Sequence, residues 1–131
     1  MKKIFLVLLL VAILFVFCSC NSNSKLDAAC QKAQTYIDTW TFPERIETKY
    51  DKESNCYVVG VYLDKSAFSG VAADLPKETA ALLYANSFKT EHYAKLQSYF
   101  DDIGTEVIIG VFDYNGTAYY GIYSSGIKTL Y

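Results

Sequence analysis

The sequence contains a single histidine, His92, and a single arginine, Arg45, among 131 residues. Recognition of nucleic-acid phosphates requires clustered lysine and arginine side chains, and a formal net charge of −2 offers no basic excess. A structural zinc site requires closely spaced cysteine and histidine ligands, which one histidine and two distant cysteines beyond residue 20 do not supply. We therefore expect no nucleic-acid partner, no metal site and no other cofactor.

Recognisable motifs of catalysis are also lacking. The sequence has no phosphate-binding glycine loop, no nucleophile elbow and no dinucleotide-binding fingerprint. His92 has no serine or cysteine nucleophile motif near it, and Asp101 and Asp102 are best interpreted as a solvated pair at a helix end. These absences predict that the protein is not an enzyme.

The chain has one long apolar run, and it lies at the start. Lys2 and Lys3 precede residues 4–17, which are all apolar, and the segment Cys-Ser-Cys follows at 18–20. A positively charged start, a short apolar core and a small residue before a cysteine are typical of an export signal. A membrane-spanning helix needs about 20 apolar residues, so this run is too short for one.

The segment Phe17-Cys18-Ser19-Cys20 resembles the lipobox of bacterial lipoproteins, with Ser19 at the small position before the acceptor cysteine. The resemblance implies that a signal peptide, residues 1–19, is removed and that Cys20 then carries fatty acyl chains such as palmitate. It implies a protein of the bacterial cell membrane, held by this lipid anchor and facing outside the cytoplasm. Residues 20–24 would form an anchored polar linker. A plain secretory signal is the alternative interpretation.

Residues 25–131 are enough for one domain. Helices are predicted over residues 26–40 and 76–103, the second with one apolar stripe that includes His92 and Tyr99 and with a break near 86–90. Strands are predicted at residues 46–50, 56–64, 105–114 and 117–124. The order is helix, hairpin, helix, hairpin, so we predict an α+β domain with a four-stranded, mainly antiparallel sheet.

Two strand segments, Val58–Tyr62 and Ile108–Phe112, match in residue type at five consecutive positions. The match is a modest hint that the helix–hairpin unit is repeated, although strands readily converge on such runs.

Cys30 and Cys56 are the cysteines of the predicted exported part. An oxidising compartment permits a disulfide between them, and a bridge that closes about 27 residues would stabilise the fold by about 3 kcal/mol. Two separate buried thiols are the other interpretation, because cysteine packs as a small hydrophobic residue.

The pair Asn115-Gly116 predicts a two-residue type I′ turn between the last two strands. With this turn, Gly110 lies opposite Gly121, and Phe112 lies opposite Tyr119. The other face of the hairpin is aliphatic and is predicted to be core under the helices; it carries Val107, Ile109, Val111, Ala118, Tyr120 and Ile122.

The glycine-containing face is rich in aromatic rings and is predicted to be a surface that contacts a partner. Its predicted partner-binding residues are Tyr62, Gly110, Phe112, Tyr119, Gly121 and Tyr123. The competing interpretation is structural, with rings folded over the gap that paired glycines leave.

A tethered domain without catalytic groups has recognition as its natural function. We therefore predict a small envelope lipoprotein that acts as a non-enzymatic binding or assembly module for a protein or a cell-envelope ligand. An inhibitor or immunity-type protein that blocks an enzyme or toxin through the turn Asp113–Gly116 is a second hypothesis. A hydrolase of envelope polymers that uses paired carboxylates is a third, less favoured one.

Overall fold

The computed structural model describes residues 24–41, 45–69 and 74–131. The predicted signal peptide, Cys20 and the linker up to residue 23 lie outside these ranges. The helical elements are α2 (Ser24–Ile37), α3 (Lys77–Phe88), the π-helical segment η3 (Lys89–Tyr93), α4 (Ala94–Ser98), and the short 3₁₀ turns η1 (Lys65–Phe68) and η4 (Asp101–Ile103). The strands are β1 (Arg45–Asp51), β2 (Cys56–Tyr62), β3 (Glu106–Phe112), β4 (Ala118–Tyr123) and β5 (Gly126–Thr129).

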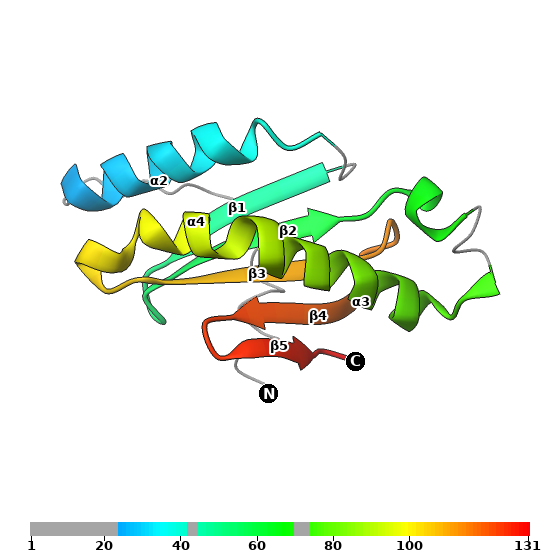
Figure 1. Cartoon of the computed structure of the whole chain (residues 1–131). Helices are drawn as coiled ribbons and strands as arrows, with labels where there is room; N and C mark the ends of the chain where they lie inside the picture. The colour runs from blue at the N-terminus through cyan, green and yellow to red at the C-terminus, as the bar shows by residue number, and fades with distance from the viewer. Residues whose placement is uncertain (1–23, 42–44, 70–73) are drawn as a thin grey trace.

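The strands form one mixed sheet in the order β1-β2-β3-β4-β5 (Figure 1). Neighbouring strands are antiparallel except β2 and β3, which are parallel. The predicted α+β class is therefore confirmed, but the prediction of four strands is wrong. The fifth strand, β5, has only four residues and one large apolar side chain, Ile127, so its pattern is too short to predict a strand.

The parallel pair explains the similarity between the two strand segments. Val58 pairs with Ile108 and Tyr62 pairs with Phe112, so the matching segments are direct neighbours in register. The two strands differ in their order after the preceding helix: β2 is the second strand after α2, whereas β3 is the first strand after α4. Both strands are buried along almost their whole length, and strands buried on both faces share near-continuous apolar sequences. The order of elements therefore does not support a repeated unit.

The helices lie together on one face of the sheet (Figure 1). Helix α2 buries one stripe, with Leu26, Ala29, Ala33 and Ile37 at three- and four-residue steps. The sheet residues packed beneath the helices are Tyr57, Val59, Val61, Val107, Ile109, Val111, Tyr119, Tyr120 and Ile122. Most of the predicted aliphatic face is therefore core, as expected, while Ala118 packs on the opposite side.

The loop between β3 and β4 differs from the predicted type I′ turn. Gly116 has a positive φ of 87°, but Asn115 does not, although type I′ requires positive φ at both central residues. The Asp113 carboxylate accepts hydrogen bonds from the backbone N–H groups of Asn115 (2.8 Å) and Thr117 (3.0 Å). By accepting these hydrogen bonds, the Asp113 side chain favours a three-residue loop, residues 114–116, over the predicted two-residue turn.

The longer loop shifts the strand register near it. Phe112 pairs with Ala118 and not with Tyr119, so that predicted pair is wrong. A bulge after Val111 then takes up one extra residue, and the predicted pairing of Gly110 with Gly121 is confirmed. The extra residue in the bulge, Tyr119, turns to the helix side of the sheet.

Candidate functional site

The predicted partner-binding residues lie on the sheet face away from the helices, except Tyr119. The rings on this face pack against one another: Tyr62 stacks on Phe112 with ring centroids 4.6 Å apart. A Cβ atom at Gly121 would approach Cε1 of Tyr123 to 2.7 Å, so this ring covers the glycine. Tyr62, Phe112 and Tyr123 are no more than 5% exposed. These observations favour the structural interpretation of the face over an open binding surface.

The two cysteines are not bonded to each other. Cys30 lies on α2 in the core under the helices, whereas Cys56 lies at the start of β2 in the cluster on the opposite face of the sheet. Burial raises the pKa of the Cys56 thiol, because a thiolate is poorly solvated there. The predicted disulfide is therefore wrong, and the alternative of two separate buried thiols is confirmed.

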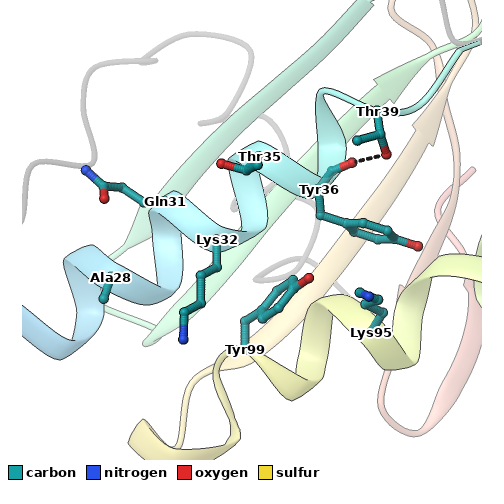
Figure 2. A pocket seen from close by; sticks show the side chains of 8 residues that line it. All are labelled: Ala28, Gln31, Lys32, Thr35, Tyr36, Thr39, Lys95 and Tyr99. Carbon is teal, nitrogen blue, oxygen red and sulfur yellow. Dashed lines mark hydrogen bonds between the residues drawn. The ribbon is translucent and has the colours of Figure 1, made fainter.

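An open groove of about 540 Å³ separates α2 from α4 (Figure 2). Most of its lining comes from the exposed side of α2, at steps that keep side chains on one side of a helix. The remainder comes from Thr39 just after α2, from α4, and from the residue that follows α4. The lining residues are Ala28, Gln31, Lys32, Thr35, Tyr36, Thr39, Lys95 and Tyr99.

Each wall of the groove carries a lysine and a tyrosine four residues apart. Lys32 and Tyr36 stand on α2, and Lys95 and Tyr99 stand on the opposite wall. Figure 2 shows the two tyrosine rings extending from their helices into the space between them. Their centroids are 6.3 Å apart and their planes are inclined at 69°. Because residues four apart lie on the same side of a helix, each lysine lies beside its tyrosine. The two pairs contact each other across the groove through Tyr36 and Tyr99, and through Lys95 and Tyr36.

The electrostatic character of the groove is basic. Both lysines are exposed, and Nζ of Lys95 lies 5.4 Å from the centroid of the Tyr36 ring, a cation–π contact. None of the lining residues carries a carboxylate, while the whole chain is net negative. The remaining polar groups are the hydroxyls of Thr35, Thr39 and the tyrosines, and the amide of Gln31. The groove therefore presents cations, hydroxyls and ring surface together.

Tyr36 is held in place by contacts with His92 and Trp40. Its hydroxyl lies 2.7 Å from Nδ1 of His92, and the His92 ring stacks on Trp40 with centroids 4.4 Å apart. Trp40 also meets the Tyr36 ring edge to face, at 5.9 Å. His92 is thus a packed partner of Tyr36, and we assign it a positioning role.

The π-helical segment η3 determines which side chains reach this site. Buried residues of α3 end at Phe88, and the next buried residue is Tyr93, a step of five. The predicted stripe is wrong at His92 and Tyr99, where the wider turn buries Tyr93 and Phe100 instead, while Leu96 is buried as predicted. His92 and Tyr99 consequently face α2. The predicted break near 86–90 overlaps η3 only at residues 89 and 90, and the backbone there stays helical, as a π-helical turn. Such turns often occur at functional sites.

Burial lowers the pKa of His92, since it disfavours the imidazolium form, and the nearby Glu91 carboxylate acts in the opposite direction. The folded state therefore binds this proton more weakly than the unfolded state, whose histidine pKa is about 6.5. The stability contributed by neutral His92 is fully present above that value and decreases as the pH falls below it.

A His92→Gln variant should lose this dependence. We expect the free energy of unfolding of the native chain to fall more than that of the variant between about pH 7.5 and about pH 5. Urea unfolding, followed by the fluorescence of Trp40, measures both. Carboxylate titrations are common to the two proteins, so an equal fall in both would contradict the burial of a neutral imidazole.

Two carboxylates that line one groove both accept hydrogen bonds from neighbouring residues. Asp101 and Glu106 line a smaller groove of about 300 Å³. Glu106 accepts hydrogen bonds from the backbone N–H and the hydroxyl of Ser124, at 3.2 and 2.9 Å, and Asp101 accepts one from Gln97 at 3.1 Å. Within residues 24–41, 45–69 and 74–131, no three acidic, histidine or cysteine side chains gather as metal ligands would.

The groove between α2 and α4 (the α2–α4 groove) is the part of the site that sequence patterns did not predict. Its walls come from residues 28–39 and 95–99, which are far apart in the chain. The available signal was the repeated spacing Lys-x-x-x-Tyr at Lys32–Tyr36 and Lys95–Tyr99.

None of the helices in the described part has the length and apolar content that crossing a bilayer would take. No family model, no curated protein and no solved structure matches the chain.

Proposed function

We propose that the protein is a lipid-anchored binding module of the bacterial envelope, without catalytic activity, whose ligand occupies the α2–α4 groove. The observation that carries the proposal is the convergence of two lysine–tyrosine pairs, Lys32–Tyr36 and Lys95–Tyr99, across one open groove. The anchoring rests on the lipobox resemblance at residues 17–20.

The groove is prepared for binding before a ligand arrives. Tyr36 is fixed through His92 and Trp40, and α2 is tied to β1 by a hydrogen bond from Thr48 to Gln34 at 3.1 Å. Side chains that are already ordered lose little conformational entropy on binding, which favours affinity.

The groove would also lie close to the membrane. Helix α2 begins at Ser24, four residues after Cys20. Four extended residues span at most about 14 Å, so an anchor at Cys20 would hold the start of this helix near the lipid surface. The proposal therefore favours a ligand that belongs to the envelope next to the membrane.

Photocrosslinking in the bacterium that makes the protein tests this proposal. A photoreactive phenylalanine analogue at Thr35, inside the groove, should give a specific adduct of the full-length protein, detected by its mass. The same analogue at Lys52, an exposed position in the turn between β1 and β2, should not give it. Adding Tyr99→Ala should remove the adduct at Thr35. No adduct at Thr35, or identical adducts at both positions, would contradict the proposal.

The same experiment addresses the inhibitor hypothesis, for which the rigid β3–β4 loop is the relevant observation. The Asp113 carboxylate is buried, binds two backbone N–H groups of this loop and lies 3.5 Å from Nζ of Lys77. A third analogue at Asn115, exposed at the tip, reports on it. A protein adduct at Asn115 without one at Thr35 would favour a blocking function over the groove.

A further inference from the structure

We propose that the ligand of the α2–α4 groove is a saccharide that bears carboxylate groups. This inference rests on the function proposed above and names the class of ligand that the groove would take. It follows from three properties of the lining: charge, ring surface and the kinds of hydrogen-bonding groups present.

Neither groove lysine forms an ion pair with a carboxylate of the described residues. Among the described residues the ion pairs are Arg45–Glu47 and Lys77–Asp113, and neither involves Lys32 or Lys95. Lys95 rests over the ring of Tyr36, and both ammonium groups are exposed. A ligand with negative charge would supply the missing partner for these two lysines.

The anion is better matched by a carboxylate than by a phosphate. Many phosphate sites in proteins add the bidentate fork of arginine, or the backbone N–H groups at a helix N-terminus, to the charge of a lysine. The groove contains no arginine, and its α2 residues begin at Ala28, beyond the first turn of a helix that starts at Ser24. One lysine on each wall suits single charges placed on separate sugar units.

The ring surface indicates a saccharide and argues against a flat aromatic anion. The planes of Tyr36 and Tyr99 are inclined at 69°, so they cannot hold a flat ring between parallel faces. A sugar ring offers C–H groups on its faces and hydroxyls around its edge. The C–H groups can pack on a tyrosine ring, while the hydroxyls meet Gln31, Thr35 and the tyrosine hydroxyls. The volume of about 540 Å³ lies within the range of small-ligand sites.

Titration of the full-length lipidated protein in detergent micelles tests the inference. The probe is trigalacturonate, and the matched neutral probe is the corresponding galactose trimer. Trigalacturonate should bind at least tenfold more tightly, and its affinity should fall as the ionic strength is raised. Lys32→Gln and Lys95→Gln should each weaken it about tenfold, as expected for the loss of a charged hydrogen bond. Lys52→Gln, which removes the same charge outside the groove, should leave it unchanged.

A second pair of variants separates binding from folding. Tyr99→Ala removes ring surface and should abolish binding, whereas Tyr99→Phe keeps the packing and should retain most of it. Unchanged Trp40 fluorescence shows that each variant is folded. Equal binding of the neutral trimer, equal binding of inorganic phosphate, or no binding of trigalacturonate would overturn the inference.

The two proposals fail in different ways. If the Thr35 analogue captures a neutral glycan, a lipid or a protein while trigalacturonate does not bind, the groove is a binding site and the ligand class is wrong. If no adduct forms at Thr35 and trigalacturonate also fails to bind, both proposals are wrong.

Discussion

Replacing Cys20 with serine is expected to remove all fatty acyl chains from the protein. The thiol of Cys20 is the predicted acceptor, and a serine hydroxyl does not form the thioether that links a lipoprotein to its diacylglycerol. Because each buried methylene contributes about 0.8 kcal/mol to membrane binding, two such chains would give a stable attachment. Growth with an alkyne-tagged palmitate, followed by purification of the protein, measures the incorporated label. We expect it to fall to background in the variant.

The neighbouring cysteine provides the matched control. Cys18→Ser changes the same atom two residues earlier, and it should leave the label unchanged because bulky Phe17 makes residue 18 a poor acceptor site. The mass of the native N-terminal peptide gives an independent readout. A native chain that starts at Met1, or a labelled Cys20→Ser protein, would contradict the predicted anchor.

Phe88→Ala is expected to cause the largest loss of stability among the substitutions proposed here. Phe88 is completely buried at the end of α3, where its ring lies 5.7 Å from Trp40 and 6.0 Å from His92, centroid to centroid. Truncating a buried phenylalanine removes apolar burial and leaves a cavity, at a cost of about 3–5 kcal/mol. This is a large share of the total of about 5–15 kcal/mol typical for a small domain.

Urea unfolding followed by Trp40 fluorescence measures this loss, since Trp40 is the only tryptophan in the chain. Leu83→Ala on the same helix is the control, because Leu83 is 58% exposed and should change stability by no more than about 0.5 kcal/mol. Phe88 also supports the residues that hold Tyr36, so its truncation should weaken groove binding even in protein that remains folded. A loss similar to that of Leu83→Ala would show that the ring is not part of the core.

The β3–β4 hairpin shows how far turn and register rules extend. The Gly110–Gly121 pair was predicted correctly, although the two-residue turn from which it was predicted is not present. The preference of Asn115-Gly116 for a two-residue turn ignores the Asp113 carboxylate, which binds the loop backbone. The added loop residue and the bulge at Tyr119 offset one another, so only the pairs nearest the turn are displaced. Such compensation depends on tertiary packing and leaves no local pattern.

The helical half of the domain was predictable in position but not in phase. The buried stripe of α2 follows the regular helical period, and its residues can be read directly from their spacing. The buried stripe of α3 and α4 changes phase between Phe88 and Tyr93. In an uninterrupted α-helix the next buried position after Phe88 would be His92, whereas the π-helical turn makes it Tyr93. Without the alternative of a π-helical turn, His92 and Tyr99 are assigned to the core. The groove could not be predicted for the same reason.

The wide turn of η3 has a consequence for how such a protein could arise. A single codon added to a plain helix creates one, because the ladder on either side keeps its regular bonding and the surplus residue is absorbed locally. Removing Thr90 reverses that step: the shortened chain should keep the buried stripe of the helix but lose the His92 contacts that hold Tyr36.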